Sequence, residues 1–271
     1  MNQHFTILLS VTESYRRIII HYFLENYSEE AIDFIDAITT DIAANSISSA
    51  EQNIIVLCDS DLSISRFQNT GYPVIACSHE NNTEESLMGV PWLILSPESL
   101  TPDFLEEVFC RHHHIPLTIV CTNRCVVREL APEDLSFLLQ LQKENEENPD
   151  GCFFPVSCDS PDSFLLEYIK NQYPFYGYGL YAILEKESAA FLGIAGFSTP
   201  SAESEGKCDI EISYALLKKY QHQGYMTEVL ESLIHPEKEN GRFEQIIARI
   251  HRSNKASIHL AKKLDILIVL T

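Results

Sequence analysis

The chain has 271 residues, of which 45% are hydrophobic and 21% are charged, and its formal net charge at pH 7 is -20. A nucleic-acid-binding surface needs clustered basic residues, so this acidity argues against DNA and RNA as partners. No apolar run reaches the ~20 residues that cross a bilayer, which argues against a membrane span. We therefore expect a cytoplasmic globular protein that is long enough for two domains.

Eight cysteines are scattered through the apparent strands and loops without a compact repeated spacing. In a reducing compartment they are expected to remain free thiols. Cys121 and Cys125 form one CxxxC pattern, and three histidines at 112–114 follow Cys110. A zinc site needs about four ligands in a tetrahedral arrangement, so we predict no metal site. The histidines instead favour the negative end of a helix.

The first half of the chain predicts a small parallel sheet covered by helices on both faces. Buried strands are expected at 5–11, 53–59, 73–78 and 90–95, with helical stretches between them and a last helix at about 103–112. Strands this apolar, separated by helices, are typical of parallel α/β sheets. We assign residues 1–116 to this α/β module and predict that it is not catalytic.

One stretch of this module has a pattern that could carry chemistry. The sequence DSDLS at 59–63 follows a hydrophobic strand. It resembles the nucleophile motif of haloacid-dehalogenase-like phosphatases, in which one aspartate, here Asp59 or Asp61, attacks and the other acts as acid and base. Such enzymes also need a lysine for the phosphate, and the first lysine of this chain is Lys143. An aspartate-rich turn with Asp61 near a helix N-cap explains the stretch better, so a phosphatase is the less favoured alternative.

The second half, residues 117–271, predicts an α+β arrangement. The stretch 118–122 opens it, followed by a strand at 125–130, a helix from Pro132 to about 147 and a helix from Ser160 to about 173. The stretches 178–184 and 190–198 predict an antiparallel hairpin around a charged turn. A strand at 208–217, a helix from Met226, a strand at 244–251 and a final helix capped by Ser253 or Asn254 complete the order.

The strand at 208–217 alternates in polarity. One face carries Ile210, Ile212, Tyr214 and Leu216, and the other carries Asp209, Glu211, Ser213 and Ala215. We expect the first face to lie in the core and the second face to look into a polar cleft.

The stretch 218–234 places a glycine where a polar loop meets an amphipathic helix. The apolar residues at 226, 229, 230 and 233 have the spacing of a helix with one buried face. Gly224 at its start lacks the Cβ that would block a ligand, and the unpartnered N–H groups of a first helical turn attract anions. On the glycine alone, a residue that only shapes the turn is the simpler interpretation.

Three signals in this half together resemble the GNAT superfamily of acyl-CoA-dependent N-acetyltransferases. They are an EIxY strand, the motif QxxGxM at 221–226, and the stretch NKASIHLAKKL at 254–264. The most similar branch contains the ribosomal-protein N-terminal acetyltransferases, and the resemblance covers about 118–264. It implies a mixed sheet, with acetyl-CoA as the co-substrate.

By this resemblance, the backbone of the glycine loop would hold the pyrophosphate of acetyl-CoA. The end of the preceding strand would pair with the pantetheine arm and polarise the acetyl carbonyl, and Asn254 would bind near the thiol unless it is only a helix cap. Met226 stands where the family usually has glycine or alanine, so its side chain is expected to turn into the core. The residues implied as cofactor-binding are Tyr214, Ala215, Leu216, His222, Gln223, Gly224, Tyr225, Met226, Thr227 and Asn254.

The implied reaction is attack by an amine on an acetyl thioester, with both substrates held side by side. The amine must lose a proton, and Glu211 on the polar strand face is our candidate for the catalytic base, directly or through water. A solvated or ion-paired strand residue is the alternative for Glu211. Relatives can carry a glutamate base on the following strand and a tyrosine acid seven residues after the asparagine. The matching positions in this chain are Arg249 and Ala261, so the resemblance implies neither role here.

The acceptor is expected to be a small-molecule amine or a protein N-terminus. The oligomeric state stays open, with a homodimer as one option. Relatives continue from KLGF into a closing strand, whereas this chain reads KLDILIVLT at 263–271. We therefore expect one strand at most there, and an incomplete acceptor site. An acyl-CoA-binding sensor with weak catalysis is the alternative to an active enzyme.

Overall fold

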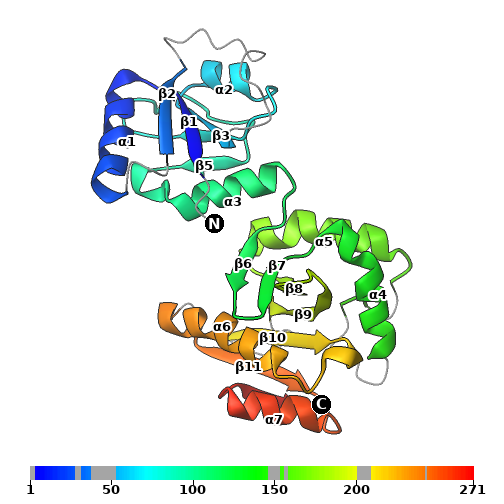
Figure 1. Ribbon diagram of the computed structural model, residues 1–271. Helices are drawn as coiled ribbons and strands as arrows, with labels where there is room; N and C mark the ends of the chain where they lie inside the picture. The colour runs from blue at the N-terminus through cyan, green and yellow to red at the C-terminus, as the bar shows by residue number, and fades with distance from the viewer. Residues whose placement is uncertain are drawn as a thin grey trace. The chain divides into compact units, whose positions relative to one another are not determined.

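The computed structural model describes residues 4–27, 32–37, 53–145, 153–155, 158–199, 209–241 and 243–271. Cys152 and Cys208 lie outside these ranges, so the predictions for them are not addressed. The chain divides into two compact units, with the boundary between Ile115 and Pro116 (Figure 1). Within the described ranges, every helix is too short or too polar to cross a membrane.

The first unit contains a five-stranded parallel sheet. In spatial order its strands are β2 (Ile32–Asp36), β1 (Phe5–Ser10), β3 (Asn53–Cys58), β4 (Val74–Cys77) and β5 (Trp92–Ile94). Helices α1 (Glu13–Asn26) and α3 (Pro102–His112) contribute to the core on one face, and α2 (Asp61–Phe67) contributes to the core on the other. The predicted parallel sheet with helices on both faces is confirmed. The edge strand β2 was missed because aspartates interrupt its apolar residues.

The second unit is built on a mixed sheet of seven strands. In spatial order these are β12 (Leu267–Leu270), β11 (Gln245–Ile250), β10 (Asp209–Leu216), β9 (Phe191–Ser198), β8 (Leu180–Glu185), β7 (Cys125–Glu129) and β6 (Thr118–Cys121). Neighbours from β6 to β10 are antiparallel, whereas β10, β11 and β12 are parallel. The predicted fold class is therefore confirmed, and the last residues form the single strand β12.

Helices cover both faces of this sheet. Helix α4 (Leu135–Glu144) follows a 3₁₀ turn at Pro132–Asp134, and it packs with α5 (Pro161–Tyr176) over one hydrophobic core. Helices α6 (Tyr225–Asn240) and α7 (Lys255–Lys263) contribute to the other core. Helix α6 connects β10 to β11, and α7 connects β11 to β12. Both connections run in the same direction across the sheet, and because such crossovers are right-handed, both helices lie on one face (Figure 1).

The prediction for the two faces of β10 is correct only in part. Ile210 and Ile212 are buried in the core shared with α6 and α7, as expected. Ala215 on the other face is also buried, because α4 and α5 cover that end of the strand. Asp209, Glu211 and Ser213 on that face remain half-exposed, and Tyr214 on the first face is half-exposed as well.

Candidate functional site

The strands β10 and β11 separate after a short stretch of pairing. Their register runs only from Asp209 with Gln245 to Glu211 with Ile247. Beyond that point β10 stays paired with β9 as far as Leu216, and β11 stays paired with β12 as far as Ile250. Each strand is thus held on its outer side while a gap opens between them.

Backbone groups of β10 face this gap. The N–H of Leu217 donates to the carbonyl of Leu192, near the start of β9, at 2.9 Å. Because strand backbone groups alternate in direction, the N–H groups of Tyr214 and Leu216 point away from β9 and towards the gap. The Leu216 carbonyl, on the same side, accepts from Nε2 of Gln221 at 3.0 Å.

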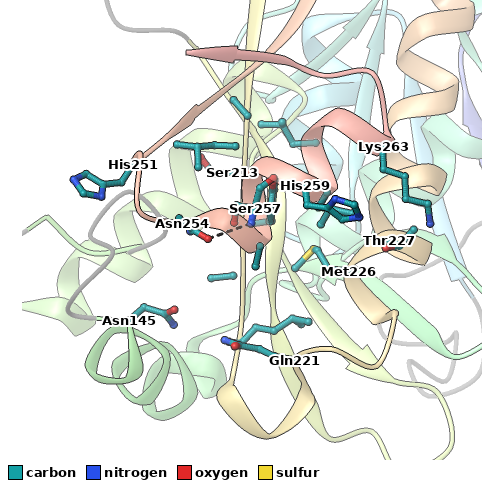
Figure 2. A pocket seen from close by; sticks show the side chains of 18 of the residues that line it. Asn145, Ser213, Gln221, Met226, Thr227, His251, Asn254, Ser257, His259 and Lys263 are labelled. Carbon is teal, nitrogen blue, oxygen red and sulfur yellow. Dashed lines mark hydrogen bonds between the residues drawn. The ribbon is translucent and has the colours of Figure 1, made fainter. Parts of the chain in front are cut away.

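The gap is a pocket of about 470 Å³, open to solvent. Its walls come from the ends of β10 and β11, the loop before α6, the first turn of α6, and one face of α7. Figure 2 shows His259 and Lys263 beside Met226 and Thr227, with Asn145, Ser213 and His251 elsewhere around the pocket. The lining residues are Asn145, Ile212, Ser213, Tyr214, Ala215, Leu216, Gln221, His222, Gly224, Met226, Thr227, Ala248, Arg249, Ile250, His251, Asn254, Ala256, Ser257, His259, Leu260 and Lys263.

The charge of this lining is opposite to that of the chain. The chain carries 39 Asp and Glu residues, yet none of the described residues that line the pocket is acidic. The lining includes the cations Arg249 and Lys263 together with three histidines. In a chain with a formal charge of -20, such a local field selects for an anionic ligand.

The start of α6 provides unpartnered donors in this pocket. Gly224 is the N-cap residue and has a φ of 82°, and His222 also has a positive φ, 60°. Within the described residues, no carbonyl accepts from the backbone N–H groups of His222 to Thr227. Successive N–H groups in such a turn at a helix N-terminus form an anion-binding concavity. The left-handed φ shows that Gly224 shapes the turn, as the simpler interpretation predicts.

Most of the residues predicted for the cofactor are brought together at this pocket. Met226 is 7% exposed and also belongs to the core beneath α6, which is the orientation expected for its side chain. Gln223 and Tyr225 lie in the same loop, but they are not among the lining residues. Those that do line the pocket are Tyr214, Ala215, Leu216, His222, Gly224, Met226, Thr227 and Asn254.

Asn254 combines a structural position with a place in the pocket. Its Oδ1 accepts from the N–H of Ser257 at 3.1 Å, so it caps α7. The hydroxyl of Tyr214 donates to the Ser257 carbonyl at 3.2 Å and thereby links β10 to the same turn. Burial raises the pKa of Tyr214, which outweighs the opposite effect of that hydrogen bond. The phenol therefore stays protonated at neutral pH.

Glu211 lies at the closed end of the gap and does not belong to the lining. Its Oε2 accepts from Nε of Arg249 at 3.2 Å, and Arg249 does line the pocket. Both side chains are mostly buried, with exposures of 16% for Glu211 and 24% for Arg249. The ion-paired alternative for Glu211 is thus part of the structure.

Several lining residues were not predicted. His259 and Lys263 share a face of α7 with Ala256 and Leu260, and their spacing of four residues is a sequence signal for a basic stripe. Asn145 and His251 come from the ends of α4 and β11. Their approach depends on the strand register, for which the sequence has no local pattern.

The aspartates of the first unit are engaged as hydrogen-bond acceptors. Asp59 is 4% exposed, and its Oδ2 accepts from the N–H of Thr12 at 2.6 Å and contacts Nε2 of His79 at 3.2 Å. Asp61 follows the N-cap Ser60 and accepts from the N–H groups of Ser86 and Leu87. This geometry supports the structural interpretation of the stretch and not the phosphatase. Among the described residues, no three His, Cys, Asp or Glu side chains are grouped to hold a metal.

Comparison with solved structures finds acetyltransferases at low sequence identity. One from Salmonella typhimurium, described as modifying the N-terminal serine of ribosomal protein L7/L12, is 19% identical with a TM-score of 0.43, covering 55% of this chain and 83% of its own. A putative ribosomal-protein-serine acetyltransferase from Vibrio cholerae is 18% identical with a TM-score of 0.44, covering 55% and 82%. An acetyltransferase from Agrobacterium tumefaciens is 18% identical with a TM-score of 0.44, covering 54% and 81%.

The family itself is shown by the sequence. The family described as the acetyltransferase (GNAT) domain matches residues 124–266, more than half of the chain. The matched range contains β7 to β11, the loop before α6 and the whole pocket. The chain therefore belongs to the GNAT acetyltransferase family and is an acyl-CoA N-acyltransferase.

Proposed function

We propose that this enzyme transfers the acetyl group of acetyl-CoA to an amine, with both substrates bound in the gap between β10 and β11. The observation that carries the proposal is the row of unpartnered N–H groups from His222 to Thr227, in a pocket whose described lining has no carboxylate. A pyrophosphate is the part of acetyl-CoA that such a helix start binds. The basic side chains of Lys263 and His259 on α7 add to the attraction.

The same pocket offers groups for the rest of the co-substrate. The N–H groups of Tyr214 and Leu216 face the gap, where an extended pantetheine arm can pair with them as a further strand would. An N–H aimed at the thioester oxygen would stabilise the negative charge that develops there during attack. Asn254 lines the pocket and keeps its Nδ2 donors for the ligand while Oδ1 caps the helix.

The reaction forms a bond between the amine nitrogen and the acetyl carbon and breaks the bond between that carbon and sulfur. The amine gives up a proton, and the departing thiolate takes one. Glu211 is our candidate for the base, reached directly or through water from the pocket. Its contact with Arg249 leaves Oε1 as the oxygen for this role. A small-molecule amine and a protein N-terminus are both acceptors of the required chemistry.

Calorimetric titration of acetyl-CoA into the parent protein and two glycine variants tests the proposal. Gly224→Glu adds bulk and negative charge at the helix start, and binding is expected to be lost. Gly241→Glu is the matched control, because Gly241 also has a left-handed φ, 60°, at the opposite end of α6, where a Cβ meets no atom within 4 Å. Its binding should match the parent.

Release of the coenzyme thiol with a panel of amines and short peptides then tests transfer. Release that depends on the amine supports an acetyltransferase that uses it as acceptor. Absence of acetyl-CoA binding by the parent, or equal binding by the parent and Gly224→Glu, would contradict the proposed site.

A further inference from the structure

Arg124 is outside the pocket, in the turn between β6 and β7, but it contacts the loop that supplies the pocket's donors. Its backbone N–H and Nε donate to the two carboxylate oxygens of Glu228, both at 2.8 Å. Its Nη1 donates to the carbonyl of Gln223 at 3.1 Å. One side chain thus binds both the residue before Gly224 and the first turn of α6.

The contact with the Gln223 carbonyl fixes the direction of a neighbouring donor. The peptide between Gln223 and Gly224 is planar and trans, so its C=O and its N–H point in opposite directions. When Arg124 holds the carbonyl on one side, the Gly224 N–H must point to the other. Gly224 lines the pocket, whereas Arg124 does not. The hydrogen bond therefore aims the Gly224 N–H away from Arg124.

The contact with Glu228 removes an obstacle to an anionic ligand. Glu228 is the acidic residue of the first turn of α6, where a carboxylate satisfies the helix but repels a phosphate. The guanidinium of Arg124 compensates its charge through the bond from Nε, and the backbone N–H of Arg124 satisfies the second carboxylate oxygen. The helix start keeps its own positive potential for a ligand.

Arg124 is itself held in place on both sides. Its guanidinium carbon lies 4.3 Å from the centre of the Tyr225 ring, and the Tyr225 hydroxyl donates to Glu185 at 2.9 Å. The carbonyl of Arg124 accepts from the N–H of Lys186 at 2.8 Å. The turn after β8 thus contacts the same residue, and these contacts favour one orientation of the half-exposed Arg124 side chain.

We propose that Arg124 is a positioning residue for the pyrophosphate of the co-substrate: it orients the Gly224 amide and neutralises Glu228, although it touches neither the ligand nor the reacting atoms. This role rests on the proposed function. It predicts that Arg124 affects the affinity for the phosphate-bearing part of CoA and not for its pantetheine part.

Binding of CoA and of pantetheine to the parent, Arg124→Gln and Arg124→Lys tests this role. Pantetheine lacks the pyrophosphate and reports on the cleft alone. Arg124→Gln removes the guanidinium hydrogen bonds to Gln223 and Glu228. Loss of the one hydrogen bond that a correctly aimed Gly224 N–H would donate to the charged pyrophosphate corresponds to a weakening of about tenfold to a hundredfold. CoA should bind Arg124→Gln more weakly by that factor, and pantetheine should bind equally well. Arg124→Lys keeps the charge but not the planar fork, so it should also bind CoA at least several-fold more weakly.

Glu185→Gln is the matched control, because it removes the negative charge beside the Tyr225 hydroxyl at the far end of this network and leaves the bonds of Arg124 to Gln223 and Glu228. It should bind CoA like the parent. Parent-like CoA affinity in Arg124→Lys would overturn the positioning role in favour of charge alone. Equal loss of CoA and pantetheine in Arg124→Gln would overturn it in favour of general distortion. If the parent protein binds CoA but acetylates no amine, the proposed function is contradicted. The comparison of CoA and pantetheine binding among the Arg124 variants still tests the positioning role in that case.

Discussion

Arg249 donates from Nε to Oε2 of Glu211 at 3.2 Å, across the point where β10 and β11 separate. The two residues come from neighbouring strands, and Arg249 continues into the lining of the pocket while Glu211 stays behind it. The pair closes the end of the gap that is opposite to the start of α6. The candidate base therefore has a cation between itself and part of the pocket.

Replacing Glu211 with glutamine tests its role in proton transfer. A general base contributes about 10²-fold to 10⁴-fold, so kcat/KM should fall within that range while the dissociation constant of acetyl-CoA stays unchanged. Steady-state kinetics with an identified acceptor measures the first quantity, and calorimetry measures the second.

Arg249→Gln is the companion variant, since it removes the other partner of the same pair. If Glu211 acts only through the ion pair, Glu211→Gln and Arg249→Gln should lower thermal stability and activity by similar, small factors. That result would remove Glu211 from the reaction.

Asn254 caps α7, and we propose that it also binds the ligand; an aspartate substitution separates the two roles. Asparagine and aspartate cap helices about equally, so Asn254→Asp should change the free energy of unfolding by less than about 0.5 kcal/mol. It replaces the Nδ2 donors with a negative oxygen, so acetyl-CoA should bind about tenfold more weakly. Asn254→Ala should lower both affinity and stability, the latter by about 1 kcal/mol. Unchanged affinity in Asn254→Asp would show that the residue only caps α7.

The helix start at Gly224 could be predicted from the sequence, because all of its signals lie close together in the chain. One glycine, a polar loop and an apolar spacing of three and four residues all lie within a single stretch. The N-cap role of Asn254 was visible for the same reason. These features depend on backbone conformation and helix period, which short sequence patterns record.

The separation of β10 and β11 could not be read from the sequence. Alternation of polarity along β10 predicts that its two faces have different surroundings. Residues of both faces nevertheless border the gap, so Ile212 and Tyr214 line the pocket together with Ser213. Arg124 and Glu228 are 104 residues apart and meet only through the strand order. Contacts of this kind depend on register and connection, for which a single sequence has no pattern.

Asp265 has a backbone conformation that glycine adopts more easily. Its φ is 53°, directly after α7, and the N–H of Ile266 donates to the carbonyl of Ala261 at 3.0 Å in the arrangement of a glycine-capped helix end. A glycine would adopt this conformation without the steric cost of a Cβ. Asp265→Gly should raise the free energy of unfolding by roughly 0.5–1 kcal/mol, measured by urea denaturation followed by circular dichroism.

Asp265→Asn controls for charge in that experiment, because the side chain is fully exposed and lies 4.0 Å from Lys238. It should behave like the parent, and Asp265→Ala should be less stable than either. Equal stability of the glycine and alanine variants would show that the left-handed conformation has no cost here.

The Arg124–Glu228 pair predicts a loss of stability in acid. Burial raises the pKa of Glu228, but hydrogen bonds from Thr122 and from the N–H and guanidinium of Arg124 overcome this and lower it to about 2. Because the folded pKa lies below the ordinary value of 4.5, the ionised carboxylate stabilises the fold fully above about pH 4.5, and this contribution is lost as the pH falls towards about 2. Melting temperatures of the parent and Glu228→Gln should therefore differ most above pH 5 and converge as the pH approaches 2. A difference that stays constant from pH 6 to pH 2 would show that the charge of Glu228 does not stabilise the start of α6.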